Sequence, residues 1–457
     1  MNKDDVGLEK LFYPDSIAVI GASNSEGKLG YNVFRNLLTN GYDKRLYPIN
    51  SKAHEVQGVK AYGSVLDIDD EIDVAIVIVP ASSTPHAIEE CCNKKIKFVV
   101  NEAAGFSEIG DDGRELENVI NEILVSPETR MLGPNCTGII NTNASMVQSI
   151  GIVEGLKEGN IGLIGQAGVY AAGILWGLRK IMNFGIIATV GNKLDINETD
   201  ILSFMGDDDN ISVICMYVED IKAGREFIDV ASEVVKKKPI IALKGGRTEA
   251  GQKVAASHTA SIAGNARIYD AVFKQCKIIK AADNDDLFET ARAFSKQPLP
   301  KGPEVVIISY AGSMGVTATD ACYENGLKLA KLSAESMDGL RDILPPYIDV
   351  KNPVDFTFDQ TGEQVAEVIK IGESDEGVDA FVVVIQAEMA DTYIKSLKDI
   401  GPTQKPVLLC IPSMEFVMDS VTELEGLGFP VYSTAEVAVK ILSKMYRYQS
   451  YGFFKHK

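Results

Sequence analysis

The sequence is poor in histidine, and its cysteines follow no pattern typical of disulfides or metal sites. The four histidines are at positions 54, 86, 258 and 456, and none lies near a cysteine at a metal-ligand spacing. The seven cysteines are an odd number and include no C-x-x-C pair. We therefore expect no zinc site, and we expect a reducing, cytoplasmic location.

Long apolar runs and an excess of positive charge are also missing. The longest apolar stretches, such as residues 74–80, are far shorter than the ~20 residues of a membrane-spanning helix. Residues 1–5 lack the basic and apolar regions of a signal peptide. With 45 Lys and Arg against 64 Asp and Glu, the formal net charge is −19. This charge argues against broad binding of nucleic acid or anionic membranes, although a local pocket can still take an anionic small ligand.

What the sequence does contain is typical of a folded α/β protein. Hydrophobic residues make up 46% and charged residues 24% of the 457 positions. At roughly 150 residues per domain, this length predicts about three domains. Short apolar runs alternate with helical patterns along the whole chain, which predicts parallel sheets covered by helices on both faces.

We divide the chain into three predicted domains, 1–145, 146–300 and 301–457. The second contains an aperiodic, glycine-rich segment at 244–264, which we expect to be a functional loop. The third follows a proline-containing linker at 297–303. The apolar runs that predict strands are 16–20, 45–49, 73–79, 96–101, 130–132, 161–164, 185–190, 212–218, 239–243, 304–309, 380–385 and 406–410.

The second and third predicted domains begin with a similar sequence pattern. The strand predicted at 161–164 leads into Gly165-Gln166-Ala167-Gly168, and the strand at 304–309 leads into Tyr310-Ala311-Gly312-Ser313. A helical pattern follows each turn. Two related lobes explain this similarity, but any parallel α/β domain also has such turns.

The first candidate site is the glycine-rich turn at 21–30, directly after the first predicted strand. Such a turn lets backbone N–H groups approach a phosphate at a helix N-terminus. Five residues separate Gly21 from Gly27, and Leu29 stands where a Walker A loop needs Ser or Thr, so this is not that loop. Asn50 follows the second strand where an NAD site prefers an acidic residue. We expect a Rossmann-type domain that binds another phosphorylated ligand, with a ligand-free tight turn as the alternative.

Two further segments are candidates. Residues 133–138 (Gly-Pro-Asn-Cys-Thr-Gly) follow the last strand of the first domain, where the carboxyl ends of parallel strands line a ligand crevice. Cys136 has no histidine near it in sequence and no evident activating charge. His258 is embedded in small residues, and a neutral imidazole is a competent nucleophile toward phosphoryl groups. A structural turn and an ordinary surface histidine are the alternatives.

Together, these motifs resemble the α subunit of ADP-forming (NDP-forming) acyl-CoA synthetases, which are relatives of succinyl-CoA synthetase. The resemblance covers essentially the whole chain, and the ordered set of motifs is much more specific than any one of them. The markers are AVIGAS at 18–23, GKLGY at 27–31, YPIN at 47–50, AGF at 104–106, GPNC at 133–136, GNK at 191–193, LKGGR at 243–247 and SHT at 257–259.

The resemblance implies a Rossmann-like CoA-binding domain followed by two flavodoxin-like domains, and it implies roles for individual residues. His258 matches the histidine that accepts the phosphoryl group, and Glu219 matches the glutamate that orients it. The positions expected to bind CoA are Gly21, Ala22, Ser23, Lys28, Gly30, Asn50, Lys52, Pro80, Gly105, Asn135 and Cys136. The positions expected to bind phosphate are Gln166, Ala167, Gly168, Gly312, Ser313, Ser257 and Thr259.

The implied reaction converts acyl-CoA, phosphate and ADP into carboxylic acid, CoA and ATP through an acyl phosphate and a phosphohistidine. We find no region that resembles an ATP-grasp lobe, so the resemblance implies that Mg-ADP or Mg-ATP binds to a separate β subunit, in an α2β2 assembly.

The chain also departs from the family pattern. Gly165 and Ala167 replace two serines of the usual Ser-Gln-Ser-Gly, Ala311–Gly315 replaces Gly-Gly-Pro-Gly, and Ala260 replaces the glycine of Ser-His-Thr-Gly. An altered, CoA-binding regulatory protein is therefore one alternative. A nicotinamide-dependent oxidoreductase is another, disfavoured by Asn50 and by the lack of a hydride-transfer site.

Overall fold

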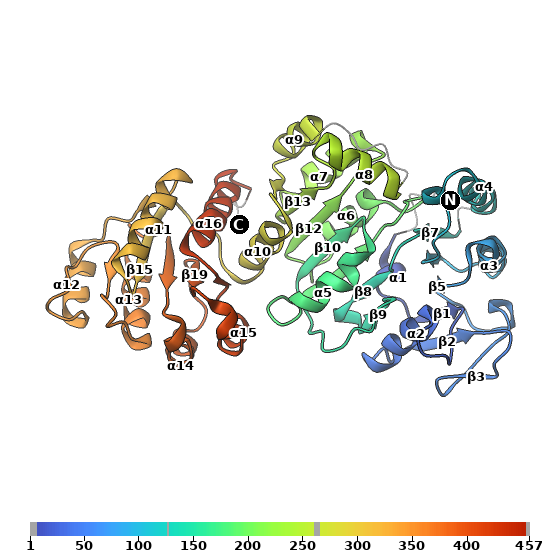
Figure 1. The fold of residues 1–457 in the computed structure, drawn as a ribbon, viewed down its shortest axis with the longest axis horizontal. Coiled ribbons are helices and arrows are strands. Elements are labelled where there is room, and N and C mark those ends of the chain that lie inside the picture. Colours follow the sequence, from blue (N-terminus) through green and yellow to red (C-terminus); the bar gives the residue numbers. More distant parts are fainter. Residues whose placement is uncertain (1–6, 126–127, 260–265, 454–457) are drawn as a thin grey trace. The chain divides into compact units, whose positions relative to one another are not determined.

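The computed structural model describes residues 7–125, 128–259 and 266–453, and it describes only the backbone at 255–259 (Figure 1). The chain forms two compact units, unit 1 (Met1–Asn284) and unit 2 (Asp285–Lys457). No described helix is both long enough and apolar enough to span a membrane.

The first sheet of unit 1 has five parallel strands in the order β2-β1-β5-β6-β7. They are β1 (Ser16–Ile20), β2 (Arg45–Ile49), β5 (Val74–Val77), β6 (Phe98–Asn101) and β7 (Arg130–Leu132). The helices that accompany them are α2 (Leu29–Thr39), α3 (Thr84–Asn93) and α4 (Asp111–Ile123), preceded by the short α1 (Glu9–Phe12); β3 (Glu55–Val56) and β4 (Val59–Lys60) form a separate hairpin. Every residue of β1, β5, β6 and β7 is buried, as expected for strands covered on both faces.

The second sheet of unit 1 has seven strands in the order β14-β13-β12-β10-β11-β8-β9. They are β8 (Ile139–Asn141), β9 (Met146–Val147), β10 (Ile161–Gly165), β11 (Phe184–Thr189), β12 (Val213–Val218), β13 (Ile240–Lys244) and β14 (Ile279–Lys280). Strands β8 and β9 are antiparallel additions at one edge. Strand β8 lies before the predicted boundary at residue 145 and β9 begins directly after it, so the chain enters the second sheet earlier than the boundary implies. Strands of three and two residues are too short to show a periodicity.

The helices of the second half of unit 1 include one that the sequence analysis places inside a loop. They are α5 (Gly173–Leu178), α6 (Glu198–Asp207), α7 (Gly224–Val234), α8 (Glu249–Thr259) and α9 (Ala266–Gln275). Helix α8 lies within the segment 244–264 that we expected to be a loop. Its sequence, EAGQKVAASHT, is rich in alanine and long polar side chains, which favour a helix even without an apolar stripe.

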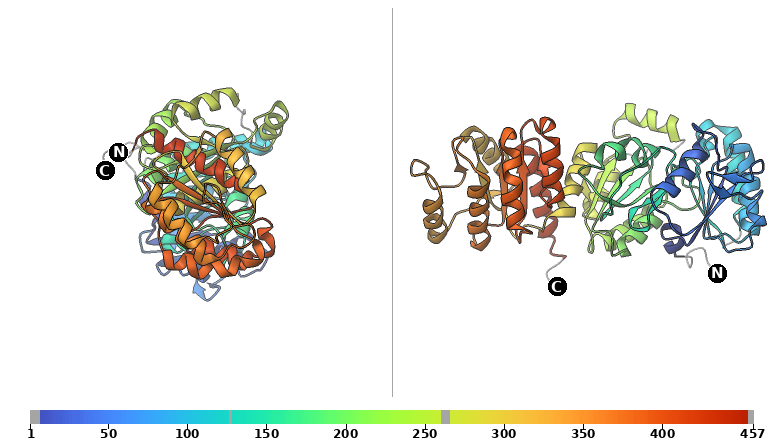
Figure 2. Two further views of the ribbon diagram at one scale, coloured as in Figure 1. Left: turned by 90° about the vertical axis from the view of Figure 1, so that its left-hand side faces the viewer. Right: turned by 90° about the horizontal axis from the view of Figure 1, so that it is seen from below.

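Unit 2 is a third parallel sheet, in the order β16-β15-β18-β19-β20, with β17 beside β15. Its strands are β15 (Glu304–Ser309), β16 (Lys328–Leu329), β17 (Val354–Asp355), β18 (Ala380–Val384), β19 (Val407–Cys410) and β20 (Val431–Tyr432). Its helices are α10 (Asn284–Lys296), α11 (Gly312–Glu324), α12 (Ala334–Ile343), α13 (Gly362–Ser374), α14 (Ala390–Ile400), α15 (Met418–Gly426) and α16 (Ala435–Ser450). Helices flank this sheet on both sides (Figure 2). The predicted α/β class with parallel sheets is confirmed.

Helix α10 packs into unit 2, although the predicted boundary at residue 300 assigns it to the second domain. Arg292 and Lys296 both pair with the buried carboxylate of Glu425 on α15. Lys444 on α16 pairs with Asp286. These buried ion pairs bring together segments far apart in the sequence, so local patterns do not reveal them.

Candidate active site

A cavity of about 840 Å³ opens into unit 1 at the carboxyl ends of strands from both sheets. Residues that follow β1, β5, β6 and β7 form one side of it, and residues that follow β10 and β11 form the other. This is the edge at which open parallel sheets bind ligands. The segments that line it are 21, 27–30, 78–80, 102–104, 135–137, 150, 166–169, 172–173 and 191–192.

Glycine is required where β1 meets α2. Gly21 has a φ of +99°, and its N–H donates to the Ile49 carbonyl at 3.1 Å. A Cβ at Gly30 would lie 2.0 Å from the Gly21 carbonyl oxygen, so only glycine lets the start of α2 pack this closely on the turn. We call Gly21, Lys28, Gly30, Pro80 and residues 102–104 the backbone wall, because its surface is mostly main chain and small side chains.

Six of the eleven residues predicted to bind CoA line this cavity: Gly21, Lys28, Gly30, Pro80, Asn135 and Cys136. The other five, Ala22, Ser23, Asn50, Lys52 and Gly105, do not line it. Two of these five stabilise nearby turns instead. Asn50 donates to the Ala22 carbonyl at 2.8 Å and accepts from the Lys52 and Ala53 N–H groups, and Ser23 accepts from Ser25 N–H.

Two buried ionisable groups lie on this side of the cavity. One is the carboxyl group of Glu102 in the backbone wall, and the other is the thiol of Cys136 in the neighbouring loop. Burial raises the pKa of Glu102 to about 8, although a hydrogen bond from Gln148 at 2.8 Å opposes the shift. Its Oε2 has no hydrogen-bond partner among the described residues. Burial also raises the pKa of the Cys136 thiol, which donates to the Asn101 carbonyl at 3.4 Å. Both groups are therefore held in their neutral forms, and Cys136 is no activated nucleophile.

The opposite side of the cavity begins at the turn after β10. Gln166, Ala167 and Gly168, which were predicted to bind phosphate, line the cavity together. The helix expected after them is broken: a 3₁₀ turn at Gly168–Ala171 precedes α5, which has only six residues. With Gly165 and Ala167 in place of serines, the polar groups here are backbone N–H groups and Gln166.

Gln166 connects this turn to the neighbouring strand. Its Oε1 accepts from the N–H groups of Glu219 (2.7 Å) and Asp220 (3.1 Å), and its Nε2 donates to Asp220 Oδ1. The buried Glu219 carboxylate also accepts a hydrogen bond from Tyr217 at 3.1 Å. Two predicted functional residues, Gln166 and Glu219, are thereby brought into one network.

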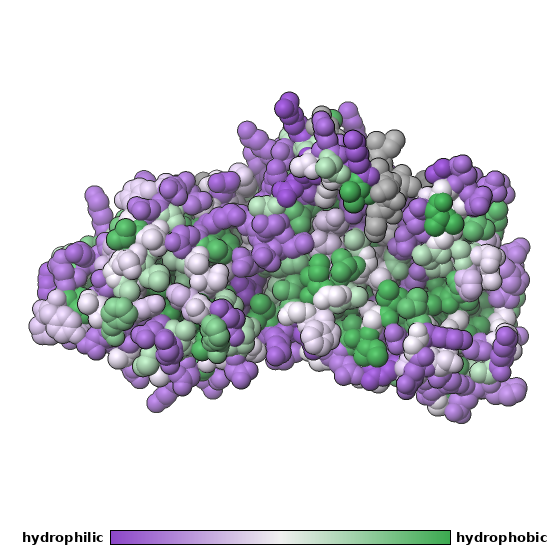
Figure 3. Space-filling view, in the orientation of Figure 1, coloured by the Kyte–Doolittle hydropathy of each residue, from purple (hydrophilic) through white to green (hydrophobic). Residues whose placement is uncertain are grey.

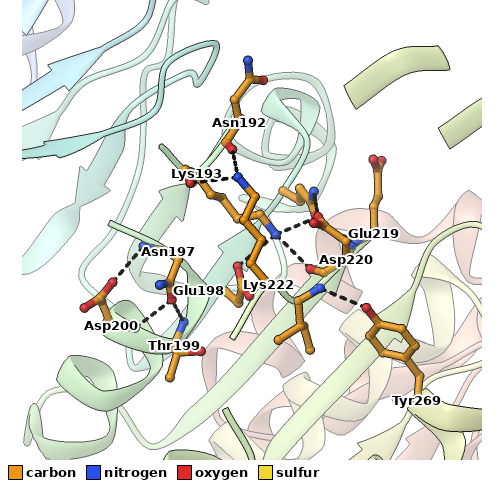
Figure 4. A network of polar contacts seen from close by, with 12 residues as sticks. Asn192, Lys193, Asn197, Glu198, Thr199, Asp200, Glu219, Asp220, Lys222 and Tyr269 are labelled. Atoms are coloured by element: carbon orange, nitrogen blue, oxygen red, sulfur yellow. Dashed lines mark hydrogen bonds and ion pairs between the residues drawn. The ribbon is translucent and has the colours of Figure 1, made fainter. Parts of the chain in front are cut away.

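Three buried charges complete this network (Figure 4). Lys193 Nζ lies 2.8 Å from Asp220 Oδ1 and 3.1 Å from Glu198 Oε2. Burial opposes the ionisation of Asp220, but Lys193 and Gln166 hold the pKa of its carboxyl below the usual value. Burial raises the pKa of Glu198, and Lys193 partly offsets this. We call Gln166, Lys193, Glu198, Asp220 and Lys222 the charged cluster.

Asn192 joins the charged cluster to the loop at 133–138. Its Oδ1 accepts from Asn135 Nδ2 at 3.3 Å, and its Nδ2 donates to Glu108 Oε2 at 2.7 Å. Its N–H donates to the Pro134 carbonyl at 2.9 Å. A Cβ at Gly191 would lie 2.1 Å from that carbonyl oxygen, so glycine is required for the two loops to touch. The GNK motif thus contacts both sides of the cavity.

The histidine segment is described only in part. The backbone of Ser257, His258 and Thr259 forms the last turn of α8, and their side chains lie outside the described residues. In unit 2, Gly312 and Ser313 begin the 13-residue helix α11. The carboxylate of Asp355 lies close to this helix start, since a Cβ at Gly312 would be 2.7 Å from its Oδ2. That negative charge weakens the anion site expected there.

Exposed apolar side chains lie in the cavity and on the neighbouring helix α5. Leu29 and Val169 line the cavity and are 49% and 51% exposed. Trp176, the only tryptophan in the sequence, lies on α5 three residues beyond the lining residue Gly173 and is 62% exposed. The Arg179 guanidinium covers its ring at 4.2 Å. In Figure 3, apolar side chains gather over the part of unit 1 where α5 lies.

The sequence analysis did not assign Glu102, Asn192, Lys193, Glu198 and Asp220 to the site. The GNK motif at 191–193 and the position of Glu102 at the end of a buried strand were signals that could have pointed to three of them. Glu198 and Asp220 gave no such signal, because ordinary surface acids have the same local sequence.

Comparisons with known proteins agree with this architecture. The CoA binding domain family matches residues 15–142, the succinyl-CoA ligase like flavodoxin domain matches 158–294, and the ligase-CoA domain matches 305–450. These matches define a protein with one CoA-binding domain and two domains of the ligase type. They confirm the predicted domain types.

Full-length relatives narrow this class. The chain is 37% identical to the alpha subunit of acetate–CoA ligase (ADP-forming) I from Pyrococcus furiosus, over 99% of this chain and 100% of that one. It is 40% identical to acetate–CoA ligase (ADP-forming) II from Archaeoglobus fulgidus, over 96% of this chain and 67% of the relative. A solved structure, the dinucleotide-forming acetyl-coenzyme A synthetase 1 of Candidatus Korarchaeum cryptofilum in complex with phosphate and ADP, matches with a TM-score of 0.90, 34% identity and 97% coverage of both chains. The chain belongs to the ADP-forming acetate–CoA ligase family, as an alpha-subunit member, which confirms the resemblance found in the sequence.

Proposed function

We propose that this chain catalyses the acyl-transfer and histidine-phosphorylation steps of an ADP-forming acyl-CoA ligase. A phosphate oxygen attacks the carbonyl carbon of the acyl-CoA, the C–S bond breaks, and CoA leaves with its sulfur as a thiolate that then takes a proton. The acyl phosphate next transfers its phosphoryl group to His258, and the carboxylate leaves. ADP finally accepts the phosphoryl group to form ATP. Each step runs in both directions.

One observation carries this proposal: six of the eleven predicted CoA-binding residues line the same cavity as the predicted phosphate-binding turn at 166–168. The backbone wall supplies main-chain N–H groups and Lys28 for the anionic end of CoA, and the apolar residues Leu29 and Val169 suit its pantetheine arm. Asn135 and Gln166 flank the place where thioester and phosphate must meet. Attack on a thioester needs positioning and charge stabilisation more than a strong base, which suits a wall of fixed dipoles.

For the second step we assign His258 as the phosphoryl acceptor and Glu219 as the residue that orients it. Gln166 supports this assignment, because it contacts the Glu219 backbone while it lines the cavity. The helix α8 that carries His258 must bring the imidazole to the acyl phosphate and then to the nucleotide. We assign Ser257 and Thr259 to the phosphohistidine environment, and Gly312 and Ser313 to a second phosphate contact.

The nucleotide step belongs, in this proposal, to a partner. This chain matches the whole of the Pyrococcus furiosus alpha subunit but only 67% of the Archaeoglobus fulgidus protein. We propose that a separate ATP-grasp β subunit binds Mg-ADP or Mg-ATP, in an α2β2 assembly. The described cysteines are all free thiols, which supports a cytoplasmic setting for this reaction.

Labelled phosphate tests the proposal. The full chain is incubated with ³²P-phosphate and a panel of acyl-CoA thioesters, with and without the β subunit, and the labelled peptide is mapped. We expect an acid-labile, base-stable label on His258 that depends on the acyl-CoA and disappears in His258→Ala. CoA binding without label in either condition would favour a regulatory protein, and label that persists in His258→Ala would exclude this histidine.

A further inference from the structure

Two lysines in the charged cluster reach past each other between the turns after β11 and β12. Lys193, in the first turn, donates from Nζ to the Asp220 carbonyl oxygen and to Asp220 Oδ1, both at 2.8 Å. Lys222, in the second turn, donates from Nζ to the carbonyls of Asn192 (2.9 Å) and Lys193 (3.1 Å). Each turn is therefore held by a lysine of the other, as Figure 4 shows.

Lys193 is an unusual residue for its position. Its side chain is only 1% exposed, and its backbone has a φ of +55°, in the left-handed region that glycine or asparagine adopts more easily. Both the burial of an ammonium group and this backbone conformation cost stability. A residue kept under such costs points to a task that its side chain performs.

The hydrogen bonds of Lys193 indicate what this task is. The Glu219–Asp220 segment has its two N–H groups bound by Gln166 Oε1 and its Asp220 carbonyl bound by Lys193. Gln166 Nε2 and Lys193 Nζ both donate to Oδ1 of the Asp220 carboxylate. The N–H groups of Glu219 and Asp220 and the Asp220 carbonyl are thus held by partners in the turns after β10 and β11.

We propose that Lys193 and Lys222 form a reciprocal clamp that positions Glu219 for the phosphorylation of His258. This inference rests on the proposed function, because Glu219 and His258 take their roles from it. Lys193 and Lys222 are positioning residues: they act through Glu219 and do not contact the acyl group. Since Asn192 beside Lys193 contacts Asn135, the clamp also ties the orientation of Glu219 to the loop that lines the acyl end of the cavity.

The decisive test uses Lys193→Met, which removes the ammonium group but keeps the stem of the side chain. We expect the initial rate of His258 labelling from ³²P-phosphate and acyl-CoA to fall about 100-fold, the effect of displacing a group near the reaction by about 1 Å. The CoA dissociation constant, measured by calorimetry, is expected to stay within about twofold. Lys236→Met, at an exposed lysine paired with Glu233, is the matched control and keeps the normal rate.

A double-mutant comparison separates positioning from a general structural role. If Lys193 acts through Glu219, then Lys193→Met adds less than about a threefold loss in the Glu219→Gln background, because the residue it positions is already disabled. Independent losses that multiply would overturn the proposal. So would a normal labelling rate in Lys193→Met, or a parallel loss of CoA binding.

Lys222→Met provides a second route, because this lysine is exposed and its removal leaves no buried charge. It is expected to slow labelling about tenfold and to be equally non-additive with Glu219→Gln. Failure of the proposed function looks different: the wild-type chain then gives no label on His258, and the role of the clamp falls with it. If His258 is labelled in the wild type and both lysine variants are labelled at the same rate, the clamp is refuted while the proposed function stands.

Discussion

The backbone wall of the cavity in unit 1 and the charged cluster, which reaches the opposite side of the cavity through Gln166, are stabilised in opposite ways. The backbone wall has glycines packed against main chain, and its buried acid Glu102 is neutral over most of the physiological range. The charged cluster has a buried lysine between two carboxylates, and the N–H, the carbonyl and Oδ1 of Asp220 are all hydrogen-bonded. The first side fits its ligand through close approach of the backbone, and the second fixes geometry through charge. The two sides are therefore expected to fail in different ways when they are changed.

The largest effect is expected in the charged cluster. Asp220→Asn leaves Lys193 short of one counter-charge in a buried site, and breaking such a pair costs about 3 kcal/mol of unfolding free energy. Denaturant unfolding measures it, and Glu233→Gln at an exposed pair serves as a control with less than about 1 kcal/mol. A cost for Asp220→Asn as small as that of the control would show that the cluster does not rely on charge.

Adding a methyl group to a glycine of the backbone wall tests how closely this wall is packed. Gly30→Ala places a Cβ 2.0 Å from the Gly21 carbonyl oxygen, so the start of α2 must shift. We expect a loss of about 1–3 kcal/mol in stability, and weaker CoA binding in calorimetry. Gly177→Ala is the matched control, since a Cβ there meets nothing within 4 Å. Unchanged CoA affinity in Gly30→Ala would place the ligand elsewhere.

The neutral acid of the backbone wall predicts a pH dependence. Because the folded-state pKa of Glu102 is raised to about 8 from an ordinary value of 4.5, the folded state holds this proton more tightly than the unfolded chain. Stability from this group is complete below pH 4.5 and is lost as the pH rises toward and through 8. Glu102→Gln cannot ionise, so its stability relative to the wild type should rise by about 4 kcal/mol between pH 5 and pH 9. A constant difference across that range would mean that Glu102 is already charged.

The smallest effect measures whether the two sides are independent. Asn192→Ala removes the contacts to Asn135 and Glu108 at the junction of the two sides. Combined with Asp220→Asn, it should show a coupling energy of about 0.5–1 kcal/mol in a double-mutant cycle of unfolding. If the two losses of unfolding free energy simply add, Asn192 does not couple the two sides.

The contrast between the two sides also explains how much could be predicted from the sequence. The α/β class, the longer strands and the glycine-rich turn with Gly21 and Gly30 were predictable, because buried parallel strands are continuous apolar runs and close backbone approach requires glycine. Asn135 and Gln166 were proposed from the family resemblance. The charged cluster was not predictable, because Lys193, Glu198 and Asp220 meet only through the order of strands in the sheet. The pairing of β8 with the second sheet and the packing of helix α10 in unit 2 have the same origin, because tertiary contacts decide where these elements lie. The position of Glu102 at the end of a predicted strand can be read from the sequence, but its neutral state depends on burial that no local pattern reveals.

The single tryptophan provides an intrinsic fluorescence probe near the cavity. Trp176 is the only indole in the chain, so its emission needs no assignment, and it lies three residues from the cavity-lining Gly173. Its ring is 62% exposed and is covered on one face by Arg179, so its fluorescence is expected to change when a bound molecule displaces that guanidinium. Rapid mixing can therefore follow ligand entry on the unmodified protein, millisecond by millisecond, without a label on either partner.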